Sequence, residues 1–245
     1  MDRIRVRAPR LRGRRWLNTG GRELDLEQLR GKIVLLDFWT FCCVNCLHVL
    51  DELRELEERF AEILVVVGVH SPKFAHEADP GAVEAAVERH CVRHPVLDDP
   101  ELWTWDAYAA RAWPTLVVVD PRGYVVAHLA GEGHAPALAM LLEDLVAEHA
   151  EVLRRGAGPY VAPPQPETAL RFPGKALALP GGTFLVSDTA HHRLVELEAD
   201  LVTVRRVIGD GERGLRDGAA PRFCEPLGLA RVPPGYSSGH DSGHD

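Results

Sequence analysis

Two cysteines, Cys43 and Cys46, are separated by two residues in a cysteine-rich stretch of the chain. A pair of thiols at this spacing is typical of thiol–disulfide exchange, in which one thiolate attacks a disulfide and the other attacks the resulting mixed disulfide. Positions three apart on a helix lie about one turn from each other, so the second sulfur can reach the first. The chemistry this pair suits is therefore electron-pair transfer between thiols and disulfides.

The segments on either side of the pair predict a strand followed by a helix. Residues 32–38 form an apolar, β-branched run that is typical of a buried strand. Residues 47–60 carry apolar side chains at helical spacing, namely Leu50, Leu53, Leu56 and Phe60. The first cysteine would then lie at a helix N-terminus, where unpaired N–H groups and the helix dipole lower a cysteine pKa from about 8.5 toward 7 or below. We expect Cys43 to be the nucleophile and Cys46 the resolving thiol.

The composition is that of an ordinary globular chain. Its 245 residues, 46% of them hydrophobic and 26% charged, suffice for one large domain or for a medium domain and a small one. The net charge of −8 argues against nucleic acid as a partner of the whole chain. Five cysteines, three of them crowded together, are unlike a secreted disulfide framework. No stretch predicts a membrane span or a signal peptide, so we expect a cytoplasmic protein with no membrane partner.

The first part of the chain predicts a mixed α/β domain. Nine arginines lie within Met1–Arg30, and residues 1–13 are expected to form a solvated or frayed basic leader. Residues 14–153 predict a single domain of alternating strands and helices. Its expected strands are 32–38, 63–69, 115–119 and 124–129. Its expected helices are 43–60, 82–92, a helix with Pro100 and Glu101 in its first turn that runs to about residue 110, and 135–153. This order predicts a mixed sheet with helices on both faces.

The second part of the chain has a different pattern. Residues 154–169 are rich in Gly, Pro and Ala and indicate a linker. Residues 170–232 predict a small all-β unit with short strands at 176–179, 183–187, 194–197 and 203–208. Residues 223–230 resemble the sequence at 172–178, so a second such unit is expected to begin there. Residues 233–245 form a low-complexity tail in which Ser-Gly-His-Asp occurs twice.

Three motifs resemble the thioredoxin superfamily. They are Asp37-Phe38-Trp39, the pair Cys43 and Cys46, and Trp113-Pro114-Thr115 at the start of a strand. The run from Phe38 to Cys46, followed by a strand-rich unit, is more closely similar to the family of NHL repeat-containing protein 2. That family joins a thioredoxin-like domain to an NHL β-propeller. The first resemblance covers about residues 14–153, and the second about 170–230, where residues 184–189 and 192–194 carry the repeat signature.

The resemblance implies roles for individual residues. Asp37 would be a buried carboxyl group with a raised pKa that relays a proton to Cys46, the alternative being a solvated acid at the end of a strand. Pro114 would follow a cis peptide bond, the alternative being an ordinary trans proline. A cis bond would leave the Trp113 backbone facing the thiols, ready to pair with an extended substrate. The expected substrate-binding residues are Trp39, Trp113, Pro114 and Thr115.

Cys42 is open to more than one interpretation. It is a spectator, a third thiol for exchange, or a metal ligand. With Cys46 it has the C-x-x-x-C spacing that resembles the copper chaperones of cytochrome oxidase, and His48 or His128 would supply a third ligand. Soft thiolates suit Cu(I).

The chain also departs from the patterns it resembles. Val44 and Asn45 stand between the cysteines where thioredoxin has Gly-Pro, Cys42 stands where it has tryptophan, and no proline follows one turn into the helix. These departures leave the redox potential and the direction of transfer open. The strand-rich part holds one repeat and a fragment of another, from which a closed propeller cannot form.

The predicted function is that of a thiol–disulfide oxidoreductase without a cofactor or a metal. Its expected partners are protein or small-molecule disulfides and a thiol reductant. A non-catalytic scaffold protein with a thioredoxin-like fold and NHL repeats is the alternative, because fold does not imply function. A copper-binding thioredoxin-like chaperone is the third hypothesis.

Overall fold

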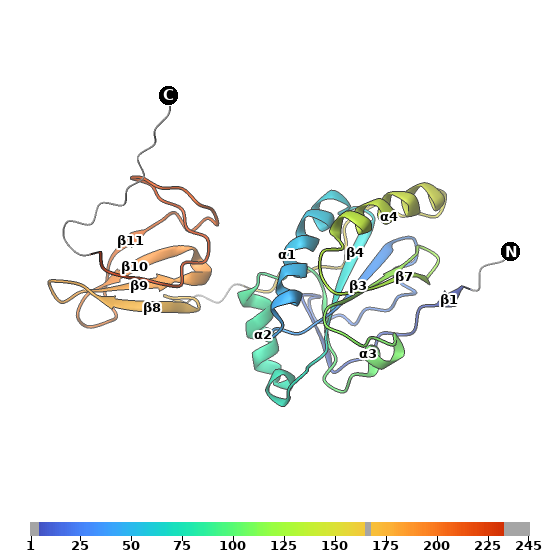
Figure 1. Ribbon diagram of the computed structural model, residues 1–245, viewed down its shortest axis with the longest axis horizontal. Helices are drawn as coiled ribbons and strands as arrows, with labels where there is room; N and C mark the ends of the chain where they lie inside the picture. Colours follow the sequence, from blue (N-terminus) through green and yellow to red (C-terminus); the bar gives the residue numbers. More distant parts are fainter. Residues whose placement is uncertain (1–4, 165–167, 233–245) are drawn as a thin grey trace, which may run out of the picture. The chain divides into compact units, whose positions relative to one another are not determined.

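The computed structural model describes residues 5–164 and 168–232, and the chain divides into two compact units between residues 164 and 165. In its described part the first unit is a seven-stranded mixed sheet with helices on both faces (Figure 1). The strands lie in the order β1-β7-β6-β3-β4-β5-β2. Their bounds are β1 Val6–Arg7, β2 Arg15–Leu17, β3 Ile33–Trp39, β4 Leu64–His70, β5 Val96–Asp98, β6 Thr115–Val119 and β7 Tyr124–Ala130. The helical segments are α1 Val44–Arg59, η1 Ala75–Ala78, α2 Pro80–Arg89, α3 Trp103–Ala107 and α4 Ala135–Glu148.

Strand β3 lies at the centre of this sheet, parallel to β4 and antiparallel to β6. Every one of its residues is buried, which explains why all of them except Asp37 are apolar. Because side chains alternate along a strand, Val34 and Phe38 join the core that contains α3, whereas Ile33 and Leu35 pack with α1 and α4. Asp37 points to the same side of the strand as Ile33 and Leu35, so its carboxyl group lies on the face of the sheet that α1 covers.

Four residues separate the end of β3 from helix α1, which runs along the sheet beside α4 (Figure 1). Its buried residues are Cys46, Val49, Leu50, Leu53 and Leu56, which agrees with the helical spacing of the leucines in the sequence. Burial of each such aliphatic side chain stabilises the fold by about 1.5–3 kcal/mol, as an upper estimate. The cysteine-bearing start of α1 is therefore held by the core rather than by a loop.

Two segments of the first unit differ from the sequence predictions. Residues 5–13 were expected to be a solvated leader, but Val6–Arg7 forms strand β1 on β7, and the Arg12 backbone N–H donates to Thr104 Oγ1 at 2.8 Å. The pairing uses backbone groups, which an arginine-rich composition does not reveal. The helix expected up to residue 110 is limited to α3, because Leu102 before it is left-handed, with φ 58°.

The second unit is an antiparallel sheet whose described strands lie in the order β11-β10-β9-β8. Their bounds are β8 Pro173–Ala178, β9 Phe184–Asp188, β10 Arg193–Leu197 and β11 Val204–Ile208, with the short helix η2 Thr189–His191 between β9 and β10. The four strands confirm the expected all-β pattern. Within residues 209–232, all of them described, the backbone makes isolated bridges but no further strand. The repeat expected to begin at residue 223 stays a prediction. The tail at 233–245 lies outside the described residues.

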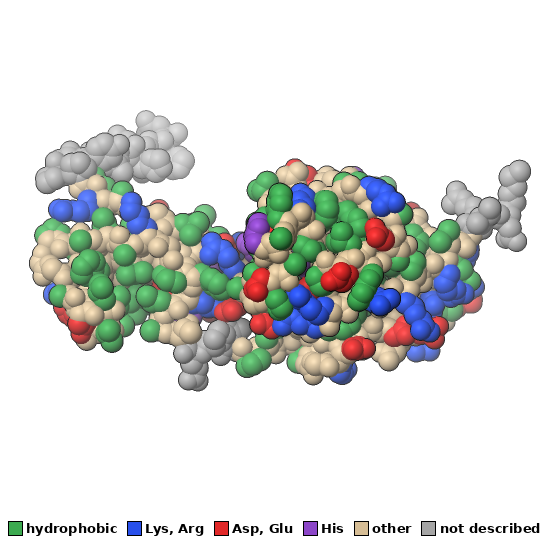
Figure 2. All heavy atoms as spheres, turned by 90° about the horizontal axis from the view of Figure 1, so that it is seen from below, with side chains coloured by type: hydrophobic (Ala, Val, Ile, Leu, Met, Phe, Trp, Pro, Cys, Tyr) green, Lys and Arg blue, Asp and Glu red, His purple; other side chains and the backbone are tan. Residues whose placement is uncertain are grey.

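The surfaces of the two units differ in character. In Figure 2 positive and negative side chains are interspersed on the visible face of the first unit. Hydrophobic side chains are spread over the visible face of the second unit, whose exposed apolar residues include Val202, Val204, Val207 and Leu215. Its small core consists of Val186, Val195 and Leu197 with Leu170. In the described ranges, no helix has the length and apolar character needed to cross a bilayer.

Candidate active site

The two cysteines lie at the start of α1, shortly after the end of β3, as the sequence predicted. Cys43 is the N-cap of α1 in an extended conformation, and its carbonyl accepts the N–H groups of Cys46 and Leu47 at 3.0 and 3.1 Å. All five cysteines are free thiols, and the thiol of Cys43 lies near enough to that of Cys46 to raise its pKa. Cys43 is 7% exposed and Cys46 is fully buried. The pair is therefore close enough for exchange, and only its first member reaches the surface.

Cys46 is a poor acid in this environment. Burial raises the pKa of its thiol far above the usual range, and the hydrogen bond with Cys43 raises it further. A hydrogen bond with the backbone of Thr40 acts in the opposite direction, and the nearby charge of Asp37 again raises the pKa. Cys46 consequently needs a base beside it before it can act as a nucleophile.

Asp37 lies near enough to Cys46 for its charge to affect the pKa of that thiol. Its side chain is fully buried, and neither carboxyl oxygen has a hydrogen-bond partner. Burial raises the pKa of Asp37 to about 8, and the negative charge of Glu57 contributes to the rise. A solvated strand-end acid, the alternative left open by the sequence, does not fit these facts. The carboxyl group is instead poised to gain or lose a proton near neutral pH.

Two buried ring nitrogens lie close to Gly68, the neighbour of Asp37 on the next strand. Gly68 is the direct partner of Asp37 across the β3–β4 pair, and a Cβ atom on Gly68 would lie 3.0 Å from Trp39 Nε1 and 3.1 Å from His94 Nε2. Both nitrogens are buried and lack a hydrogen-bond partner. The other ring nitrogen of His94, Nδ1, is 3.0 Å from Glu57 Oε1. The Glu57 side chain is 22% exposed, so this row of groups leads from beneath the thiols to solvent.

The Trp113–Pro114 peptide bond is cis, as the resemblance implied. Cys43 Sγ lies 3.9 Å from the Trp113 carbonyl oxygen. The Trp113 ring is fixed by a hydrogen bond from Nε1 to the Ser71 carbonyl at 2.7 Å and by stacking on Trp105 at 4.0 Å between centroids. A half-buried residue is thus held rigidly beside the Cys43 thiol.

The remaining predicted substrate-binding residues are placed differently. The side chains of Trp39 and Thr115 are fully buried, and Pro114 is buried as well. Thr115 pairs with Phe38 on one side and with Ala130 on the other. These side chains pack beneath the site and cannot touch a substrate in this conformation. Of the four, Trp113 alone offers both an accessible surface and a position beside Cys43.

The copper-ligand set considered from the sequence is not assembled. Within the part of the chain that the structure describes, the one group of three or more potential ligands joins Cys42 to His76 and Glu77, and it does not include Cys46, His48 or His128. His48 Nδ1 instead contacts Glu132 Oε2 at 2.8 Å. No sequence spacing connects His76, Glu77, Glu57 or His94 with the thiols, because tertiary folding alone brings each of them to the site.

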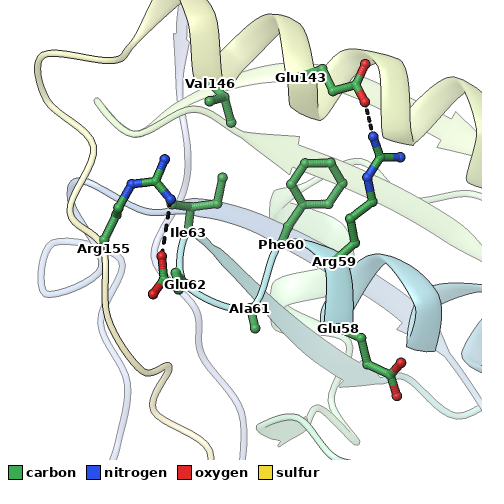
Figure 3. A pocket seen from close by; sticks show the side chains of 9 residues that line it. All are labelled: Glu58, Arg59, Phe60, Ala61, Glu62, Ile63, Glu143, Val146 and Arg155. Atoms are coloured by element: carbon green, nitrogen blue, oxygen red, sulfur yellow. Dashed lines mark hydrogen bonds and ion pairs between the residues drawn. The ribbon is translucent and has the colours of Figure 1, made fainter.

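A surface pocket of about 430 Å³ lies away from the thiols. It is lined by residues at the end of α1 and in the connection before β4, with Glu143 and Val146 of α4 and Arg155 (Figure 3). The ion pairs Arg59–Glu143 and Arg155–Glu62 flank the ring of Phe60. Because β3 and β4 are parallel, this pocket lies at the end of the strands opposite to the thiols.

Comparison with known proteins agrees with this geometry. Residues 31–125 match a family model described as Thioredoxin-like. Thiol-disulfide oxidoreductase YkuV of Bacillus subtilis (strain 168) is 28% identical over 148 residues, which are 60% of this chain and 98% of YkuV. A solution structure of a thioredoxin-like protein in the oxidized form superimposes with a TM-score of 0.53 at 29% identity, covering 60% of this chain and 99% of that one.

Other relatives match over a longer part of the chain. NHL repeat-containing protein 2 of Gallus gallus is 37% identical over 232 residues, and Protein SUPPRESSOR OF QUENCHING 1, chloroplastic, of Arabidopsis thaliana is 36% identical over 231. Each match covers 88% of this chain, but the chain spans 31% of the first relative and 21% of the second. The chain therefore contains a thioredoxin-like domain and is homologous, over 88% of its length, to NHL repeat-containing protein 2 and SUPPRESSOR OF QUENCHING 1.

Proposed function

We propose that the first unit is a thiol–disulfide oxidoreductase whose reacting groups are Cys43 and Cys46. The observation that carries the proposal is the placement of two neighbouring thiols at the start of α1 together with the unpartnered buried carboxyl group of Asp37. Similarity to YkuV, which is named a thiol-disulfide oxidoreductase, supports the same class of reaction. The substrates are protein or small-molecule disulfides, and the electron donor is a thiol reductant.

In the first step the Cys43 thiolate attacks one sulfur of the substrate disulfide. A bond forms between Cys43 and the substrate, the substrate S–S bond breaks, and the other substrate sulfur leaves as a thiolate. Cys43 suits this role because it is the more exposed member of the pair and caps a helix whose first N–H groups favour negative charge. The neighbouring Trp113 carbonyl is available to accept a backbone N–H from an extended substrate.

The second step requires a thiolate on Cys46. Asp37, with a pKa of about 8, is ionised in a fraction of molecules near neutral pH and takes the proton from the Cys46 thiol. The Cys46 thiolate then attacks the Cys43 sulfur, the mixed disulfide breaks, and the second substrate thiolate leaves. Two electrons have passed to the substrate, and a thiol reductant converts the Cys43–Cys46 disulfide back to the dithiol.

His94 and Glu57 provide a route for the proton held by Asp37 to reach solvent. When Glu57 accepts the hydrogen bond from Nδ1–H, the Nε2 atom of His94 carries the lone pair and lies close to Gly68. An imidazole in this position can accept a proton on its inner nitrogen and release one from its outer nitrogen. The partly exposed Glu57 then passes that proton to water.

Reduction of insulin disulfides, with dithiothreitol as the electron donor, tests the proposal. We expect Cys43→Ser to abolish the reaction. The reduced Cys46→Ser chain, mixed with insulin after dithiothreitol is removed, should stop at a mixed disulfide that mass spectrometry detects. Cys91→Ser is the matched control, because Cys91 lies outside the site, and it should leave the rate unchanged. Retained activity in Cys43→Ser would overturn the proposal. So would a wild-type chain that never loses two hydrogens across Cys43 and Cys46 under mild oxidant, as a non-catalytic scaffold would behave.

A further inference from the structure

A second group of reactive side chains lies next to the dithiol but is separate from it. Cys42 precedes the α1 N-cap, and His76 and Glu77 belong to η1. One ligand atom from each of the three residues lies within 4.8 Å of the other two. Cys42 Sγ and His76 Nε2 are 3.4 Å apart. The proposed exchange reaction uses none of these groups.

The spacing of these atoms fits a tetrahedral metal ion. Zinc binds a cysteine sulfur at about 2.3 Å and a histidine nitrogen at about 2.0–2.1 Å, so the two ligand atoms of a tetrahedral site are about 3.5 Å apart. The observed separation of 3.4 Å between Cys42 Sγ and His76 Nε2 matches that value. An ion can therefore bridge this edge of the cluster with almost no movement of either side chain.

The ligand groups are also held in position by their surroundings. Glu77 is fully buried, and its Oε2 accepts the backbone N–H groups of Lys73 at 2.6 Å and Phe74 at 2.9 Å. These bonds, and a weaker one from the Cys42 N–H to Oε1 at 3.3 Å, aim the carboxylate at the cluster. The His76 ring is stacked on Phe74, with 5.8 Å between centroids. Outer groups that orient ligands in this way are typical of protein metal sites.

We propose that Cys42, His76 and Glu77 bind a zinc ion and leave its fourth coordination position open to solvent. A thiolate, an imidazole and a carboxylate together suit Zn²⁺, whereas Ca²⁺ and Mg²⁺ prefer oxygen ligands and Cu(I) prefers more sulfur. Cys42 and His76 are both exposed, so an ion has a path to the site. Binding converts the Cys42 thiol to a thiolate, with release of its proton.

The dithiol itself is a competing metal ligand, so the test is made in the Cys43→Ser/Cys46→Ser double variant of the full chain. Cobalt(II) is titrated as a spectroscopic substitute for zinc. We expect one equivalent to produce a thiolate-to-cobalt charge-transfer band and the visible bands of a tetrahedral ion, and zinc to displace it. Adding Cys42→Ser should remove the charge-transfer band, and adding His76→Gln should weaken binding. Cys224→Ser, at an exposed thiol of the second unit, is the matched control and should change nothing.

Two outcomes would overturn the proposal. One is a double variant that is folded by circular dichroism yet gives no charge-transfer band with cobalt. The other is a band that survives Cys42→Ser in the otherwise unaltered chain and disappears in the double variant, because the dithiol would then be the ligand. The Cys42→Ser chain keeps its core, since Cys42 is exposed, so the second comparison holds even if the double variant folds poorly. The result does not depend on whether the chain reduces disulfides.

Discussion

Each unit of this chain buries an aspartate completely, but the two carboxyl groups have opposite surroundings. Asp188, at the end of β9 in the second unit, accepts the Arg171 N–H at 2.7 Å, His191 Nδ1 at 2.8 Å and Arg193 Nε at 2.7 Å. Asp37, in β3 of the first unit, has no hydrogen-bond partner on either oxygen. The two residues are equally buried, at 0% exposure.

The difference separates a structural carboxylate from a reactive one. A buried carboxylate surrounded by donors stabilises its fold as long as all partners remain. A buried carboxyl group without donors costs stability when it ionises, and folded proteins retain such groups chiefly where a shifted pKa is used. Asp188 fits the first description and Asp37 the second. The predictions below test this contrast by making the same substitution in both places.

The largest effect on stability is expected from Asp188→Asn. The amide cannot accept from all three donors, and Arg193 loses its charged partner in a partly buried site, so the second unit should lose about 2–3 kcal/mol. Hydrogen exchange of β9 and β10 amides in the full chain measures this as a loss of protection of about 30- to 150-fold. Asp37→Asn is the matched control and should leave those amides unchanged. Unaltered protection in Asp188→Asn would contradict the structural role.

Asp37→Asn should instead impair the chemistry. Without a base the Cys46 thiol resolves the mixed disulfide slowly, and loss of one general base typically lowers a rate by about 100-fold or more. The measurement is the pH dependence of disulfide reduction, from which an inflection near pH 8 should disappear. Asp188→Asn is now the control and should keep both the rate and the inflection. A wild-type profile in Asp37→Asn would mean that another group accepts the proton.

Sequence patterns predicted the parts of this fold that depend on local periodicity. The apolar run of β3 and the leucine spacing of α1 follow directly from burial on a two-sided sheet, and they located the cysteine pair correctly. The cis bond before Pro114 and the burial of Asp37 rested on resemblance rather than on spacing. The edge strand at Val6–Arg7 was missed because its partner is more than a hundred residues away and its side chains are exposed.

The groups around the thiols could not be read from the sequence for a related reason. Glu57 of α1 contacts His94 in the loop before β5. His76 contacts Cys42 because η1 follows β4, the strand beside β3. No fixed spacing connects these residues. Burial without a partner, the property that distinguishes Asp37 from Asp188, is likewise a property of the folded state alone.

The smallest expected effect concerns stability against pH, and its sign follows from the raised pKa of Asp37. The folded chain keeps a proton on Asp37 up to about pH 8, whereas the unfolded chain releases it near pH 3.9, so stability falls as the pH rises between these values. His70 acts in the opposite sense, because burial lowers its pKa to about 4, but it is neutral in both states above about pH 6.5. Between pH 6.5 and 8 the first unit should therefore lose about 2 kcal/mol.

Tryptophan fluorescence during urea unfolding isolates this effect, because all five tryptophans lie in the first unit. The Asp37→Asn chain should show no loss over the same pH interval, since an amide does not titrate. The negative charge of Glu57 raises the pKa of Asp37. Glu57→Gln should therefore lower that pKa and shift the loss of stability toward lower pH. An equal slope in wild type and Asp37→Asn would show that the buried carboxyl group is not the titrating residue, and the contrast with Asp188 would lose its basis.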